Sequence, residues 1–258
     1  MERPKRRSMT KVRARTRLDE AMVERGLVDT RNKARAVILA GDVKLPGREG
    51  VRPTPGMLVA ADESIDLVSR PRFVSRGGEK LAHALQVFGV SPAAGAALDV
   101  GASTGGFTDC LLQGGARRVY AVDVGYGQLD ATLRNDPRVV VMERVNAREG
   151  FDLPERVDLV VVDVAFISLR LVLPPVLRHL KHGGTAVVLF KPQFEAKRGE
   201  VGRTGVIRDP QLHATLLGRF IVWLVDHGIR LRGLTSSPIL GDKGNREFLL
   251  HLQPIMFQ

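Results

Sequence analysis

The stretch Leu98-Asp99-Val100-Gly101-Ala102-Ser103-Thr104-Gly105-Gly106-Phe107-Thr108-Asp109 decides the fold of this chain. Residues 96–100 form a short apolar strand that runs directly into a glycine-rich turn, and the turn opens a helix. Because glycine has no side chain to keep a ligand from the backbone, such a turn suits close binding. The spacing G-x-x-x-G-G differs from the G-x-G-x-x-G of a dinucleotide pyrophosphate site.

A tight turn without a phosphate cradle predicts a nucleoside-bearing cofactor such as S-adenosylmethionine, although a purely structural strand–turn–helix looks similar. The strand at 119–123 ends in Asp123, where an acid typically accepts hydrogen bonds from a ribose diol; the alternative is an N-cap. Asn146, after the strand at 139–142, is predicted to face the adenine. The expected contacts from the turn itself are Asp99, Gly101, Ser103, Thr104, Gly105, Gly106 and Phe107.

Composition narrows the class of protein. The chain has 258 residues, 44% of them hydrophobic, and a formal net charge of +11, which predicts a polyanionic partner, nucleic acid before membrane. No apolar run approaches the roughly 18 residues that span a bilayer. The single cysteine, Cys110, excludes an internal disulfide and is expected to be buried, and the six histidines show no metal-ligand spacing. We therefore expect a cytoplasmic enzyme without a metal.

The N-terminal quarter reads as a basic module. Residues 1–16 are predicted to be a disordered arm and residues 17–68 a small domain of two helices, at 18–25 and 30–40, followed by short strands. Arg31, Lys33 and Arg35 cluster at the start of the second helix, where they either meet RNA phosphates or form a solvated face.

This module resembles the ribosomal-protein-S-four-type RNA-binding domain. The likeness rests on Arg17-Leu18-Asp19, Gly26-Leu27-Val28, residues 31–34, residues 37–43 and residues 56–65, and it departs at Leu45-Pro46-Gly47, where the family has Val-Asn-Gly. The resemblance implies a structured RNA partner, with Arg17 added to the basic residues above.

After a basic linker at 69–76, which includes the candidate RNA contacts Arg72 and Arg76, residues 77–258 alternate helix and strand. Nearly continuous apolar strands predict a parallel sheet covered on both faces. The last two strands, at 229–234 and 246–252, are joined by a link too short for a helical crossover, so they should be antiparallel. The expected fold is α/β: a Rossmann-like, seven-stranded, mostly parallel sheet with a reversed last strand. Trp223, on a helix at 210–227, is expected in the core.

Four charged residues should meet at one edge of this sheet. Ligands bind at the carboxyl ends of parallel strands, where Asp163 and Lys191 follow the fourth and fifth strands. Glu247 begins the reversed strand at the same edge, and Lys80 opens a neighbouring helix. Buried charges are costly unless paired, so the alternatives are a structural ion-pair network or a catalytic site.

This set resembles the K-D-K-E tetrad of ribose 2′-O-methyltransferases. Four motifs are similar, more narrowly, to the TlyA family, which comprises rRNA cytidine 2′-O-methyltransferases that are often labelled haemolysin A. The likeness covers residues 17 to about 253 and rests on residues 74–81, residues 99–109, Lys191-Pro192-Gln193-Phe194-Glu195 and Gly244-Asn245-Arg246-Glu247-Phe248.

The resemblance implies methyl transfer from S-adenosylmethionine to a cytidine ribose in the RNA of ribosomal subunits. Lys191 is the expected base or alkoxide stabiliser. A free lysine is protonated at neutral pH, and nearby positive charge favours its neutral form. Asp163 and Glu247 would orient the two ammonium groups, Asp163 would also contact the cofactor, and Lys80 would position the ribose and its phosphates.

Two other classes of function remain as alternatives. A membrane-active haemolysin would need a spanning or amphipathic segment and export, for which the sequence shows no signal. An inactive RNA-binding protein on a methyltransferase fold should have lost tetrad residues, whereas all four positions are filled.

Overall fold

The computed structural model describes residues 15–68, 72–202 and 204–255. It divides into two compact units, Met1–Pro71 and Arg72–Gln258, and each is described by itself. Residues 1–14 of the predicted arm (1–16), and residues 69–71 of the predicted linker, lie outside the described residues. The prediction of disorder is wrong for residues 15 and 16, which belong to a short strand that pairs with residues 59 and 60.

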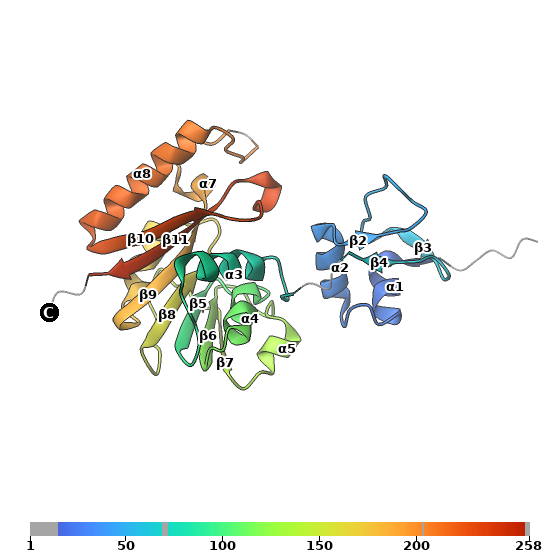
Figure 1. Cartoon of the computed structure of the whole chain (residues 1–258), viewed down its shortest axis with the longest axis horizontal. Coiled ribbons are helices and arrows are strands. Elements are labelled where there is room, and N and C mark those ends of the chain that lie inside the picture. The colour runs from blue at the N-terminus through green and yellow to red at the C-terminus, as the bar shows by residue number, and fades with distance from the viewer. Residues whose placement is uncertain (1–14, 69–71, 203, 256–258) are drawn as a thin grey trace, which may run out of the picture. The chain divides into compact units, whose positions relative to one another are not determined.

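The first unit is built from two helices and two short strand pairs (Figure 1). Helix α1 spans Leu18–Glu24 and α2 spans Arg31–Ala40. Strand β1 (Arg15–Arg17) pairs antiparallel with β3 (Leu58–Ala60), and β2 (Val43–Lys44) pairs antiparallel with β4 (Asp66–Leu67). The Thr30 side chain caps α2 by accepting from the Lys33 N–H, and Gly41 ends it in the left-handed conformation, as the sequence predicts. Buried residues such as Leu18, Met22 and Ile38 form the core.

The second unit contains the predicted sheet. Its strands are β5 (Ala96–Val100), β6 (Arg118–Asp123), β7 (Val139–Glu143), β8 (Val157–Val162), β9 (Leu180–Phe190), β10 (Ile229–Ser236) and β11 (Phe248–Pro254), in the order β10-β11-β9-β8-β5-β6-β7. Strands β5 to β9 pair in parallel, whereas β11 runs antiparallel to both β9 and β10. The prediction of a reversed last strand is therefore confirmed.

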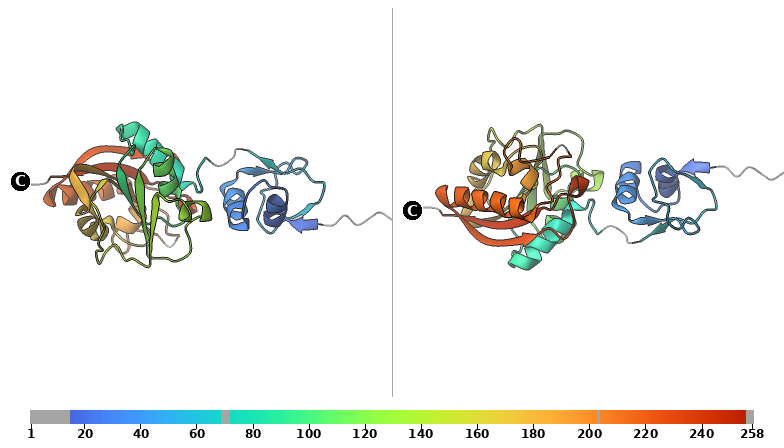
Figure 2. Two further views of the ribbon diagram at one scale, coloured as in Figure 1. Left: turned by 90° about the horizontal axis from the view of Figure 1, so that it is seen from below. Right: turned by 90° about the horizontal axis from the view of Figure 1, so that it is seen from above.

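Helices cover both faces of this sheet (Figure 2). Helices α3 (Gly77–Phe88), α4 (Gly106–Gln113) and the short α5 (Ala131–Arg134) pack on one face, and α6 (Leu169–Leu177) and α8 (Pro210–Asp226) pack on the other. Strand β8 illustrates how both faces are covered. Leu159 and Val161 pack into the core beneath α3 and α4, whereas Val160 and Val162 pack into the core beneath α6 and α8, because successive side chains of a strand point to opposite faces. Because both faces are buried there, residues 159–162 of β8 and 186–190 of β9 are all apolar.

Residues 72–76 belong to the second unit. Phe73 is buried in its core, the Val74 N–H donates to Asp109 Oδ2 over 2.8 Å, and Gln113 Nε2 donates to the Arg72 carbonyl over 2.9 Å. The segment that leads into α3 is thus attached to α4, the helix opened by the glycine turn.

The expectation that Trp223 belongs to the core is confirmed only in part, because it packs against the core without being fully buried. Trp223 is only half-buried, and its ring stacks between those of Phe220 and His227. The buried residues of α8 are His213, Leu216, Leu217, Phe220 and Leu224, and Trp223 lies beside that stripe because successive helical residues turn by about 100°.

Candidate active site

The glycine turn brings β5 against the end of β8. Gly101 has φ of +85°, and a Cβ on it would lie 2.3 Å from the Asp163 carbonyl oxygen. Gly105 has φ of +96°, where a Cβ would lie 2.3 Å from Leu133. A side chain on residue 101 would therefore push the glycine turn away from Asp163, which follows β8.

Asp99 and Asp123, which the sequence predicts as cofactor contacts, hold the glycine turn and the start of α4 by hydrogen bonds. Asp123 accepts from the Ser103 N–H over 2.8 Å and from the Gly125 N–H over 2.6 Å. Asp99 has no exposed surface and accepts from Thr108 Oγ1 over 2.7 Å, and its burial raises its carboxyl pKa to about 7. Both residues therefore fix the geometry of the turn.

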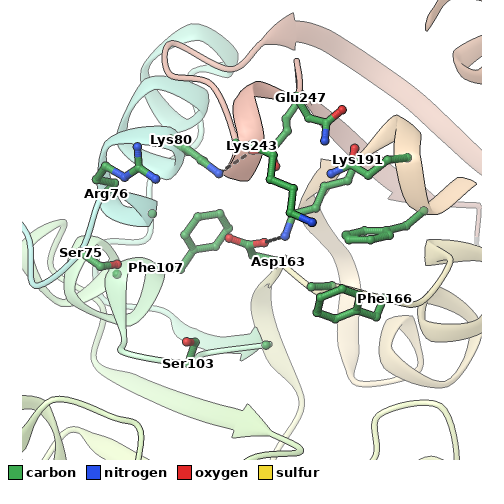
Figure 3. A pocket seen from close by; sticks show the side chains of 18 of the residues that line it. Ser75, Arg76, Lys80, Ser103, Phe107, Asp163, Phe166, Lys191, Lys243 and Glu247 are labelled. Atoms are coloured by element: carbon green, nitrogen blue, oxygen red, sulfur yellow. Dashed lines mark hydrogen bonds and ion pairs between the residues drawn. The ribbon is translucent and has the colours of Figure 1, made fainter. Parts of the chain in front are cut away.

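Above the turn lies a pocket of about 540 Å³ at the carboxyl ends of the parallel strands (Figure 3). Two lysine–carboxylate pairs face it. Lys80 Nζ of α3 lies 2.5 Å from Glu247 Oε2, and Lys191 Nζ lies 2.6 Å from Asp163 Oδ1. The side chains of these four residues are between 3% and 21% exposed, so the pairs are largely desolvated but open to the pocket.

The sheet topology explains how residues so distant in sequence meet. Lys191 follows β9 directly, and Phe248 of β11 pairs with Phe190, which places Glu247 beside Lys191. Val162 pairs with Val100, which sets Asp163 beside the glycine turn. A reversed β11 is required, because a parallel strand would begin at the opposite edge.

Most of the predicted catalytic and cofactor-binding residues line this pocket, and four of them do not. Asp99, Gly105 and Asp123 are not among the lining residues, and the exposed Asn146 donates to Glu149 over 2.7 Å. The predicted residues that line the pocket are Arg76, Lys80, Gly101, Ser103, Thr104, Gly106, Phe107, Asp163, Lys191 and Glu247.

Sequence reasoning missed an aromatic pair at the mouth. Phe166 is 91% exposed and adopts a φ of +63°, which is unusual for a bulky residue. Its ring centroid lies 5.2 Å from that of Phe194, and both rings line the pocket. An aromatic residue just after the fourth and fifth strands is the signal that could have identified them.

The short helix α7 (Pro192–Glu195) ends in a buried acid that the sequence reasoning also missed. Glu195 accepts from Ser168 Oγ and from the Leu169 N–H, each over 2.6 Å, at the N-terminus of α6. Burial raises the pKa of this carboxyl. Glu195 therefore joins the loop after β8 to the loop after β9.

The candidate RNA contacts of the first unit differ in their partners. Arg17 and Arg31 both pair with Asp19, which has no exposed side-chain surface and whose pKa the Arg17 hydrogen bond lowers to about 2. Lys33 pairs with Asp29. Arg35 is exposed, with no ion pair among the described residues. Arg17 and Arg31 thus hold the unit together, and Arg35 is the basic side chain left open to solvent.

Two classes of site are not found within the described residues. No group of three or more histidine, cysteine or acidic side chains is placed to hold a metal ion. In the same part of the chain, no helix is both long and apolar enough to cross a membrane.

Comparison with known proteins agrees with this geometry. The model of FtsJ-like methyltransferases matches residues 73–254. The chain belongs to this family. It is also 44% identical, over 243 residues, to the 16S/23S rRNA (cytidine-2′-O)-methyltransferase TlyA of Mycobacterium tuberculosis, with 93% of this chain and 90% of TlyA covered.

Two further similar proteins are named as hemolysins. Hemolysin A of Brachyspira hyodysenteriae is 44% identical over 240 residues, covering 91% of this chain and 98% of that protein. A solved structure titled "Putative hemolysin from Streptococcus thermophilus" matches with a TM-score of 0.72 and 41% identity, covering 92% of this chain and 88% of that one. An S-adenosylmethionine-dependent methyltransferase structure from Listeria monocytogenes, 17% identical with a TM-score of 0.51, shares the fold.

Proposed function

We propose that this methyltransferase transfers the methyl group of S-adenosylmethionine to the 2′-hydroxyl of a cytidine in ribosomal RNA. The observation that carries the proposal is the convergence of two lysine–carboxylate pairs on one pocket beside the glycine turn. The names of the TlyA relatives support the choice of substrate.

The residues around the turn fit this cofactor. Gly101 and Gly106 leave backbone open to the pocket, and Phe107 offers an apolar surface beside them. Asp123 does not line the pocket, but its carboxylate lies beside Ser103, which does, so we retain it as the candidate acceptor for the ribose diol. Asn146 would have to turn away from Glu149 to reach an adenine, and it is retained as the candidate neighbour on that condition. When bound, S-adenosylmethionine supplies a methyl group on a positively charged sulfur. Two carboxylates, those of Asp163 and Glu247, line the same pocket, and each is paired with a lysine.

The tetrad can align and activate a ribose hydroxyl. Asp163 Oδ1 holds Lys191 Nζ by a 2.6 Å contact, and Lys191 lines the pocket. The hydrogens or lone pair of Nζ that Asp163 does not engage are then available to a substrate hydroxyl. As a neutral amine, Lys191 takes the proton of the hydroxyl; as an ammonium, it stabilises the developing alkoxide. Glu247 holds Lys80 in the same way, so that Lys80 can donate to ribose oxygens.

The aromatic pair fits a nucleobase. Any base can stack on an aromatic ring, and such stacking contributes about 1–3 kcal/mol of binding free energy per base. Phe166, exposed and held at the mouth, together with Phe194, can stack a cytosine whose ribose reaches Lys191. An enzyme that reaches a ribose within folded RNA must draw its nucleotide out of the stack, and such a platform compensates part of that cost.

We further propose that residues 17–68 form an S-four-type RNA-binding domain that supplies substrate affinity. Two helices with short antiparallel strands, the exposed Arg35 and the overall charge of +11 support this. A chain beginning at residue 69 should then bind cofactor but lose most of its activity on ribosomal subunits. Full activity of that shortened chain would place substrate selection in the second unit.

The function is tested with ribosomal subunits from a strain that lacks the corresponding gene. Purified enzyme and S-adenosylmethionine are added, and rRNA fragments are analysed by mass spectrometry. The expected result is a mass increase of one methyl group on a cytidine, resistant to alkaline cleavage at its 3′ side because the 2′-oxygen is blocked. A methyl group on a base, or no transfer, would refute the proposal.

A further inference from the structure

A third lysine faces the pocket without a role in the tetrad. Lys243 lies in the short turn Asp242–Gly244 that precedes β11, and it lines the pocket. Figure 3 shows its side chain reaching into the pocket beside the two ion pairs. Lys80 and Lys191 each have a carboxylate partner, whereas Lys243 has no ion pair among the side chains that the structure describes.

The lining of the pocket has an excess of positive charge. Lys80 and Lys191 are balanced by the carboxylates of Glu247 and Asp163, and the ammonium of Lys243 is additional to these two pairs. A site for a sulfonium cofactor alone has no use for an excess of cations, because like charges repel. The additional positive charge indicates that an anionic group enters the pocket.

The backbone at Lys243 is held in an unfavourable conformation. Its φ is +58°, a region that glycine occupies without cost and lysine rarely adopts. Such strain persists where the surrounding structure fixes it, and it clusters at functional sites. The turn therefore presents this side chain at a defined place.

Neighbouring contacts fix the turn relative to the tetrad. Asn245 is 3% exposed, accepts from the Ile207 N–H over 3.0 Å and donates to the Gly205 carbonyl over 3.0 Å. A Cβ on Gly241 would lie 2.1 Å from Glu247 Oε1, so the turn packs directly on the catalytic carboxylate. Lys243 thus keeps a constant position with respect to Glu247.

We propose that Lys243 binds a backbone phosphate of the RNA strand next to the target ribose. The inference rests on the proposed function and names a contact within the same site. The 2′-oxygen and the 3′-phosphate are carried by adjacent ribose carbons, so an oxygen that reaches Lys191 brings a phosphate close to this side of the pocket. A lysine ammonium is a common ligand for phosphate.

The test compares Lys243→Asn with Lys243→Arg. Asparagine tolerates a positive φ better than most residues, so the first variant removes the charge without adding backbone strain, and the second retains the charge. Cytidine, cytidine 3′-monophosphate and cytidine 5′-monophosphate are the probes, measured as competitive inhibitors of methylation of ribosomal subunits. At least one monophosphate should inhibit the wild type about tenfold more strongly than cytidine. Lys243→Asn should remove that difference, and Lys243→Arg should keep most of it.

A second measurement uses the ribosomal subunits themselves. Loss of one phosphate contact lowers the slope of log affinity against log salt by about one. We expect this for Lys243→Asn and not for the matched control Lys181→Asn, since Lys181 lies near the start of β9, at the opposite edge of the sheet from the pocket. Affinity for S-adenosylmethionine should stay within about twofold.

The proposal is overturned if Lys243→Asn weakens cytidine and both monophosphates equally and leaves the salt slope unchanged. A loss confined to S-adenosylmethionine affinity would also overturn it, because Lys243 would then contact the cofactor. Absence of methylation by the wild type would refute the proposed function instead, which separates the two failures.

Discussion

The Glu195 carboxylate and the Ser168 hydroxyl lie 2.6 Å apart, although they belong to the loops that follow two different strands. The same carboxylate caps α6 through the Leu169 N–H. One loop begins at Asp163 and carries Phe166, and the other begins at Lys191 and carries Phe194. Glu195 therefore links the two segments that carry the Lys191–Asp163 pair and the aromatic pair.

Removing this connection should slow methyl transfer without preventing cofactor binding. A displacement of about 1 Å at a reacting centre costs up to about a hundredfold in rate, so Glu195→Ala should lower kcat by about that factor. Glu195→Gln keeps an acceptor oxygen and should recover most of the rate. Single-turnover methylation and calorimetry with S-adenosylmethionine measure the two quantities. Normal kcat in Glu195→Ala would assign Glu195 to α6 stability alone.

Lys191→Ala should reduce methylation by about 10²–10⁴-fold and leave S-adenosylmethionine affinity nearly unchanged, because Lys191 acts on the hydroxyl. The pH profile of the wild type distinguishes its two roles. A general base gives a rate that rises tenfold per pH unit below its pKa, whereas an ammonium that stabilises an alkoxide gives no such rise. A near-normal rate in Lys191→Ala would exclude both.

Asp123→Ala should weaken S-adenosylmethionine by roughly 1.5–3 kcal/mol, or about ten- to a hundredfold. The variant loses the ribose acceptor and also two hydrogen bonds, from the N–H groups of Ser103 and Gly125, that shape the turn. Asp123→Asn keeps one acceptor oxygen, so its affinity for S-adenosylmethionine should fall between those of the wild type and Asp123→Ala. Calorimetry on folded variants provides the comparison, and equal affinities would remove Asp123 from the site.

The raised pKa of Asp99 predicts a particular pH dependence of stability. In the unfolded chain the Asp99 carboxyl ionises near pH 3.8, whereas in the folded chain it holds its proton until about pH 7. This group therefore stabilises the fold below the lower value, and its contribution is lost as the pH rises to 7, at up to about 1.4 kcal/mol per unit. Asp99→Asn carries no charge at any pH. Its free energy of unfolding relative to wild type should therefore rise from pH 4.5 to 7.5 in urea titrations, and a constant difference would contradict the assignment.

Two arginines on α2 should behave differently on charge reversal. Arg35→Glu should weaken binding to ribosomal subunits and reduce its salt dependence while leaving the Tm unchanged, because Arg35 has no ion pair among the described residues. Arg31→Glu should also lower the Tm, since it places a carboxylate against the buried Asp19. Equal effects of the two variants on Tm and binding would refute this division.

Periodicity and topology made much of the second unit predictable. Apolar strands, the turn at Gly101 and the short link before β11 determine which strand ends share an edge, and hence that Lys191 and Glu247 meet. Side-chain direction was not predictable in the same way. Asp99 points under the turn, and Asn146 turns outward to Glu149, because those orientations depend on packing across the sheet.

Long-range partners account for the remaining differences. Arg31 looks like an RNA contact in sequence, but the fold places it against Asp19, twelve positions away. The left-handed conformations of Phe166 and Lys243 leave no mark in the local pattern, since neither residue type favours a positive φ. These are the positions where the fold imposes a conformation that local preference opposes.

The position of β11 between β9 and β10 has a consequence for biosynthesis. Strand β11 is translated after every parallel strand, and Glu247, the ion-pair partner of Lys80, is 167 positions further along the chain. Until that strand inserts, β10 has no neighbour in the sheet and the pocket lacks Glu247. Glu247 is therefore synthesised after Lys80, Asp163 and Lys191, and the two lysine–carboxylate pairs are complete only once β11 has entered the sheet beside β9.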